Sequence, residues 1–224
     1  MTVRTAKVTL TGVTPLLMRR NDDDWEKVLK QWRSDPSNKE KNVKGDDRSP
    51  AFTWIGGIYH DGKVIGMPAD NLMTMLREGG AKVPTGKGQG TYKRQTQSCL
   101  IVMEPMWPMV TVSGKTIPWS AIEALNTEED FDKHIAMARK NDFELFKKAV
   151  IVRGSRNIRI RPMFAKGWQI TGTIAVTDDV ITNEVFENVL IYGGRYAGLG
   201  DWRPSAPKAP GPYGQFVPEI EWLK

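Results

Sequence analysis

Residues 168–204 read WQITGTIAVTDDVITNEVFENVLIYGGRYAGLGDWRP. Within 168–176, large apolar residues alternate with mostly polar ones, which predicts a strand with one buried face. Within 183–192, the apolar residues recur at helical spacing, so a helix is expected there. A glycine-rich loop over 193–204 follows that helix directly. A strand, a helix and a loop that leads to a last strand are typical of one half of a small α+β domain.

The rest of the chain supplies the elements that complete this pattern. The expected elements are a first strand at 6–10, a helix at 68–77, strand-like segments at 149–152 and 158–164, and a last strand at 216–222. Their order, β-α-β-β-α-β, predicts an α+β protein with a ferredoxin-like (RRM-like) core, an antiparallel sheet and both helices on one face.

Residues 1–224 are therefore interpreted as a single elaborated RRM-like domain with three large insertions. These insertions cover approximately 19–50 (a charged loop and a helix), 82–98 (a basic, finger-like loop) and 104–148 (a hairpin and helices). Local patterns also predict a hairpin over 52–67, with its turn at Asp61-Gly62, and helices at 119–125, 128–139 and 142–148. Gly79-Gly80 is expected to stop the helix that begins at Pro68.

Composition narrows the class of protein. The chain has 224 residues, 40% of them hydrophobic, and a formal net charge of +6, which favours acidic partners such as nucleic acid. Its single cysteine and two histidines exclude a disulfide and a Cys/His metal cluster, so no cofactor or metal is expected. Because no segment reads as a signal peptide or a membrane span, a soluble cytoplasmic protein is expected.

The glycine-rich loop predicts a site for a polyanion. Glycines let backbone N–H groups approach a phosphate, while arginines supply charge and aromatic rings supply flat faces for bases. The candidate residues of the loop are Gly194, Arg195, Tyr196, Gly198, Gly200, Trp202 and Arg203. The simpler alternative is a helix cap followed by a structural turn, because many helices end in glycine.

Three segments resemble one protein family. Gly12 to Met18 looks like its turn after the first strand, Ile65 to Arg77 is similar to its proline-initiated first helix, and Gly193 to Gly200 resembles its glycine-rich loop. The family is the RAMP superfamily of CRISPR effector proteins, in particular the backbone subunits of class 1 complexes. The resemblance implies a non-catalytic subunit that binds guide RNA, polymerises along it head to tail, and joins other effector subunits.

The chain also departs from that family. It is short for a backbone subunit, and the Pro-rich segment after Asp201 to Pro204 is not required by the family pattern. A phage or plasmid relative that coats single-stranded DNA or RNA is therefore an alternative.

Binding that accepts any base sequence needs cations for the phosphates. A first group, Arg153, Arg156, Arg159 and Arg161, surrounds a predicted strand in which Arg159 and Arg161 share the face opposite the core. Further candidates are Lys87, Lys93 and Arg94 in the basic loop, and Arg19 and Arg20 after the first strand. A solvated, arginine-rich strand is the alternative interpretation.

Two other functions remain open. An RNA-processing endonuclease would need His60 or His134, both expected to face solvent, or Asp22 to Asp24 as metal ligands, which are more simply the acidic start of a helix. A structural assembly protein, such as a virion component, would use the eight tryptophans in subunit contacts. We therefore expect no enzymatic activity.

Overall fold

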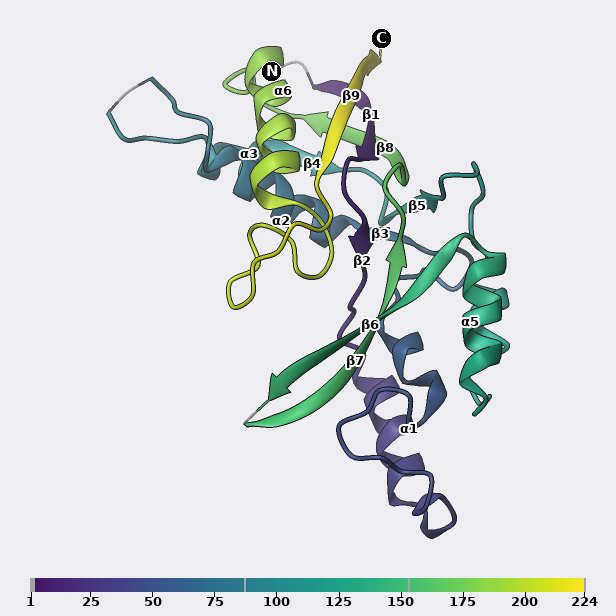
Figure 1. Cartoon of the computed structure of the whole chain (residues 1–224). Coiled ribbons are helices and arrows are strands. Elements are labelled where there is room, and N and C mark those ends of the chain that lie inside the picture. Colours follow the sequence, from purple (N-terminus) through teal and green to yellow (C-terminus); the bar gives the residue numbers. More distant parts are fainter. Residues whose placement is uncertain (1–2, 87, 153, 224) are drawn as a thin grey trace.

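The computed structural model describes residues 3–86, 88–152 and 154–223 (Figure 1). The strands are β1 (Arg4–Gly12), β2 (Leu16–Leu17), β3 (Gly66–Pro68), β4 (Leu100–Val102), β5 (Met106–Val110), β6 (Phe143–Val152), β7 (Ser155–Phe164), β8 (Gln169–Val176) and β9 (Phe216–Leu223). The helices are α1 (Asp23–Ser34), α2 (Ala69–Gly80), α3 (Lys93–Cys99), α4 (Trp119–Glu123), α5 (Phe131–Lys140) and α6 (Asn183–Tyr192), with 3₁₀ turns η1 (Pro36–Asn38) and η2 (Ala51–Gly57) and a π-helical turn η3 (Gly193–Ala197). The protein is thus α+β, as expected.

The larger sheet has the order β3-β5-β8-β1-β9, and β4 also pairs with β8. All of these pairings are antiparallel, and Val8 at the centre of β1 lies between Gly172 and Ile220. Ala6, Val8 and Leu10 are fully buried, as their alternation predicts. Figure 1 shows α2 and α6 together on one side of this sheet, where their apolar faces cover it.

The smaller sheet has the order β2-β7-β6. Its β6–β7 hairpin projects away from the larger sheet in Figure 1. The expectation that 158–164 supplies a core strand next to β8 is therefore wrong, because that position is taken by β4 and β5. A period-two pattern identifies a strand but does not say which strand it pairs with, since backbone hydrogen bonds are the same for every partner.

Three local expectations are also wrong. Residues 51–57 form a 3₁₀ helix rather than a strand, because Phe52, Trp54 and Ile55 all reach the core from consecutive turns. Residues 143–148 belong to β6 rather than to a helix, since pairing along the whole of β7 outweighs local helix propensity. The basic loop is shorter than expected, because α3 begins at Lys93.

The helix α2 ends at Gly80, as the Gly79-Gly80 pair predicts. A Cβ at Gly79 would come within 2.3 Å of the carbonyl oxygen of Val189 in α6. Gly79 therefore also permits close packing of α2 against α6.

His134 is fully buried, although the sequence predicts a solvent-facing side chain. Trp54 Nε1 donates to His134 Nδ1 at 3.2 Å, so the ring proton lies on Nε2, which donates to the carbonyl oxygen of Glu128 at 2.8 Å. Burial lowers the pKa of His134 from its ordinary value of 6.5. The imidazole is accordingly a neutral, hydrogen-bonded part of the core.

We expect acid to destabilise the protein partly through His134. The unfolded chain protonates this ring near pH 6.5, whereas the folded protein resists protonation until a lower pH. The free energy of unfolding is therefore complete above about pH 6.5 and decreases as the pH falls through the lowered folded pKa. Urea titrations of the wild type and of His134→Gln across this range measure the effect; parallel pH profiles for the two proteins would contradict it.

Within the described residues, no helix is long and apolar enough to cross a bilayer.

Candidate functional site

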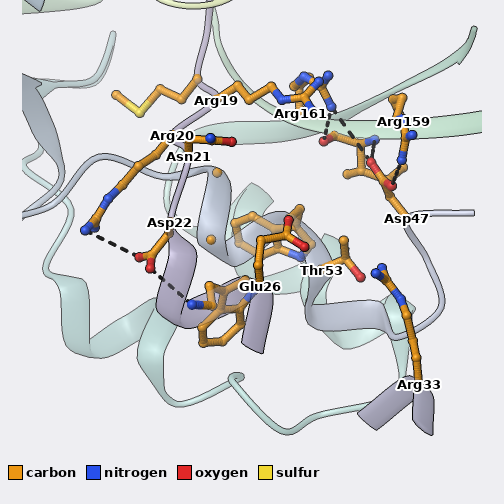
Figure 2. A pocket seen from close by; sticks show the side chains of 16 residues that line it. Arg19, Arg20, Asn21, Asp22, Glu26, Arg33, Asp47, Thr53, Arg159 and Arg161 are labelled. Atoms are coloured by element: carbon orange, nitrogen blue, oxygen red, sulfur yellow. Dashed lines mark hydrogen bonds and ion pairs between the residues drawn. The ribbon is translucent and has the colours of Figure 1, made fainter. Parts of the chain in front are cut away.

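A hollow of about 290 Å³ lies between α1, η2 and β7, and five arginines line it (Figure 2). Arg19 and Arg20 come from the segment after β2, Arg33 from the last turn of α1, and Arg159 and Arg161 from β7. We call these five residues and the space between them the arginine hollow. Four of the five were candidates from the sequence, and the fold brings them together from positions about 140 residues apart.

Three carboxylates share this hollow. Asp47 accepts from Arg159 Nη1 at 2.7 Å, Asp22 lies 3.4 Å from Arg20, and Glu26 is exposed on α1. Asp201, which does not line the hollow, also pairs with Arg161, so five arginines against four carboxylates leave a formal excess of one positive charge.

Arg159 and Arg161 both reach Asp47, so they share one face of β7 as the alternation predicts, but Arg161 is buried there, with 4% of its surface exposed. Its Nε donates to Asp201 at 2.7 Å, and its Nη1 lies 3.8 Å from Asp47. Burial lowers the pKa of this guanidinium, and the hydrogen bond that Arg161 donates to Asp201 opposes that change. Arg161 therefore serves as a structural cation that ties β7 to the glycine-rich loop.

Arg19 and Arg33 differ from the other three arginines. Both are exposed, and across residues 3–86, 88–152 and 154–223 neither side chain has a carboxylate within 4.0 Å. Figure 2 shows Arg33 reaching from α1 toward the side of the hollow that carries Thr53 and Asp47. Arg33 was not a candidate from the sequence, because its position on an expected amphipathic helix carries no signal of a distant partner.

Three backbone N–H groups of the glycine-rich loop are already used within the protein. The N–H groups of Gly198, Leu199 and Asp201 donate to carbonyl oxygens of the protein at 2.8, 2.9 and 2.8 Å. Gly200, at φ +76°, lies so close to β2 that a Cβ would come within 2.1 Å of the Leu17 carbonyl oxygen. Gly194 is buried and similarly packed against Phe216. These glycines allow close packing, which agrees with the simpler interpretation of this segment as a helix cap followed by a structural turn.

Tyr196 and Trp202 have different surroundings. Tyr196 is 47% exposed and Arg195 beside it is exposed, so both remain available to a ligand. Trp202 instead packs within the protein: Lys148 Nζ lies 4.3 Å from its ring centroid, and the rings of Phe146 and Tyr213 lie 6.1 and 6.3 Å away. Trp202 is therefore not an open platform for a base. The contact of Lys148 with Trp202 was not predicted from the sequence, because the segment that carries Lys148 was expected to be a helix.

A second hollow of about 150 Å³ lies beside the loop and is lined by Tyr59, Asn71, Thr74, Gly198, Leu199, Gly200 and Arg203. Arg203 is partly neutralised by Glu78, 4.0 Å away. The hydroxyl of Tyr59 donates to the carbonyl oxygen of Arg19 at 3.0 Å. The two hollows are thus adjacent, separated by the segment that carries Arg19.

The remaining candidate cations lie outside both hollows. Lys93 and Arg94 are exposed in the first turn of α3, and Arg156 is exposed near the tip of the β6–β7 hairpin. Lys87 and Arg153 lie outside the described residues.

The residues considered for catalysis have structural partners. Asp22 caps α1 by accepting from the N–H groups of Asp24 and Trp25, in agreement with an acidic helix start. His60 is not freely solvated, because its ring stacks on Trp119 at 3.5 Å and contacts Arg20 at 3.1 Å. Burial, and then the charge of Arg20, lower the pKa of His60. Among the described residues, no group of three or more His, Cys, Asp or Glu side chains is placed to hold a metal ion.

The fold and the arginine hollow define an α+β protein with antiparallel sheets and a concave surface rich in arginine. In comparisons with known proteins, the chain matches no family model and no curated protein.

Proposed function

We propose that this protein is a non-catalytic subunit that binds single-stranded nucleic acid, most simply RNA, without regard to base sequence. The observation that carries the proposal is the arginine hollow, in which Arg19 and Arg33 have no carboxylate partner among the described residues. Unpaired guanidiniums in a concave surface are suited to phosphates, which they bind with planar, bidentate geometry. Phosphates are common to every nucleotide, so such contacts carry no sequence preference.

The topology supports a ferredoxin-like interpretation of the core. Apart from β3, the strands of the larger sheet lie side by side in the order β9, β1, β8, and then β4 with β5. Along the chain, α2 connects β1 to β4, and α6 connects β8 to β9. That is the order expected for β-α-β-β-α-β with an antiparallel sheet. The same arrangement supports the proposed relation to the RAMP superfamily.

The open face of this sheet is a poor surface for base stacking. Thr9 and Thr171 hydrogen-bond to each other across it at 3.0 Å, and Lys7 lies 3.8 Å from Glu221. An ordinary RNA-recognition motif would stack bases on aromatic residues of this face. We therefore assign binding to the arginine hollow and to the exposed Arg195 and Tyr196 of the glycine-rich loop.

We further propose that copies of the chain associate head to tail along the strand, with other effector subunits as partners in a CRISPR complex. Heterologous contacts do not close on themselves, so the length of such a filament would follow that of the strand. A phage or plasmid protein that coats single-stranded DNA would use the same hollow. Sequencing of the nucleic acid that co-purifies with the protein separates these sources, since guide RNAs are uniform and have repeat-derived ends.

The test of strand binding is the double variant Arg19→Glu/Arg33→Glu. We expect its affinity for single-stranded oligonucleotides to fall about 10- to 100-fold at low salt for all base sequences, because two phosphate contacts become repulsive. The slope of log K against log salt should become shallower by about 1.4, or about 0.7 for each lost contact. Fluorescence anisotropy over a salt series measures both quantities.

The matched control is Arg139→Glu/Lys140→Glu, which makes the same change of charge at exposed positions at the end of α5. We expect this control to retain most of the affinity. Equal losses in the two double variants would mean that net charge alone governs binding, and an unchanged affinity in Arg19→Glu/Arg33→Glu would assign binding to another surface.

A further inference from the structure

The cations of the arginine hollow fall into two sets. Arg159 and Arg161 are held in place by carboxylates at 2.7 Å, and Arg20 is held by Asp22 and His60. Arg19 and Arg33, which have no carboxylate within 4.0 Å in the part of the chain that the structure describes, approach from different elements. A hollow with three fixed and two free guanidiniums is pre-organised on one side and adaptable on the other, which lowers the entropic cost of binding an anion.

The fixed arginines also retain donors for a ligand. A guanidinium has five N–H donors, and the hydrogen bond of Arg159 to Asp47 uses only its Nη1. Its Nε and Nη2 have no protein acceptor among the described residues. Arg159 can therefore hold Asp47 and donate to an anion at the same time.

The charge and size of the hollow select among phosphates. Arg19 and Arg33, which have no carboxylate within 4.0 Å among the described residues, together match a phosphate monoester, which carries about −1.5 to −2 at pH 7 and three acceptor oxygens. An internal phosphodiester offers one charge and two free oxygens. The volume of about 290 Å³ is at the lower limit of ligand pockets, which span about 300–1,000 Å³, and so suits a single terminal nucleotide rather than a long stretch of strand.

We propose that the arginine hollow binds the terminal phosphate of a nucleic-acid strand, with Arg19, Arg33 and Arg159 as its ligands. This inference rests on the proposed function and adds to it the chemical group that the hollow recognises. The hollow takes an internal phosphodiester only where the strand has no terminal phosphate, and the surface outside the hollow, which includes Arg156 and Arg195, contacts the rest of the strand. Such a site would set the position of the first subunit on the strand.

The test compares three oligonucleotides of one sequence with an internal fluorophore: one with a 5′ phosphate, one with a 3′ phosphate and one with hydroxyls at both ends. We expect one of the phosphorylated strands to bind about tenfold more tightly than the hydroxyl-ended strand, because its terminal phosphate gains a charge-assisted bidentate contact. Arg19→Gln/Arg33→Gln should remove this difference, whereas Arg139→Gln/Lys140→Gln should retain it. Inorganic phosphate should abolish the gain, because it competes for the hollow, and should weaken binding of the hydroxyl-ended strand only in part.

The outcomes separate the two proposals. Equal affinities for the three strands overturn the terminal-phosphate site and leave strand binding intact. A preference that persists in Arg19→Gln/Arg33→Gln also overturns it, because the end is then recognised elsewhere. If no strand binds at low salt, both proposals fail; circular dichroism of each variant verifies that it is folded.

Discussion

Replacing Gly172 with alanine is expected to lower the free energy of unfolding by about 3 kcal/mol or more. Gly172 lies in β8 opposite Val8, and a Cβ at this position would come within 2.0 Å of Trp107 Nε1. Trp107 is fully buried, and its Nε1 donates to Glu104 at 3.0 Å. The indole must therefore leave its site or push β8 out of the sheet, and both movements sacrifice core packing.

Chemical denaturation of Gly172→Ala, beside the control Gly57→Ala, measures this effect. A Cβ at Gly57 would have its nearest neighbour at 3.8 Å, which is ordinary contact, so we expect a change below about 1 kcal/mol there. A double-mutant cycle with Trp107→Phe gives the second check. If the clash explains the loss, the double variant is more stable than the sum of the single effects predicts; strict additivity would point to another cause.

Asp47→Asn is expected to change stability and binding in opposite directions. Asp47 is 7% exposed, accepts from Arg159 Nη1 at 2.7 Å and from the backbone N–H of Ile160 at 3.1 Å, and lies 3.8 Å from Arg161. Loss of its charge leaves Arg161 with Asp201 as its remaining partner, at a cost of about 2–4 kcal/mol. The same loss adds one positive charge to the hollow, so affinity for a single strand should rise about three- to tenfold at low salt.

Urea denaturation and fluorescence anisotropy, both at a temperature where the variant is folded, measure the two effects. The control is Asp46→Asn, whose ion pair with the half-exposed Arg48 is worth less than about 1 kcal/mol. Lower affinity in a folded Asp47→Asn protein would show that Asp47 orients Arg159 for the ligand more than it opposes the ligand's charge. Unchanged stability would mean that solvent reaches the Arg161 site.

The sequence identified most of the arginines of the candidate site, but it did not predict where they lie relative to one another. Arg19, Arg20, Arg159 and Arg161 were each expected to bind a polyanion, and all four line one hollow. Their individual roles were not predictable, because the burial of Arg161 depends on Asp47 and Asp201, which lie 114 and 40 residues away along the chain. Arg33 joins the site only because α1 packs beside η2.

Local patterns in the sequence were enough to predict the α+β class, the helices α1, α2 and α6, and the strands β1, β8 and β9, because their apolar residues repeat with the period of each element. Only the three-dimensional packing shows that β4 and β5 pair with β8, that 143–148 is a strand, and that the glycines of the loop allow close contact with β2 and β9. Periodicity records which face of an element is buried. Strand partners, buried ion pairs and the arginine hollow depend on contacts between residues far apart in the chain, which no local pattern contains.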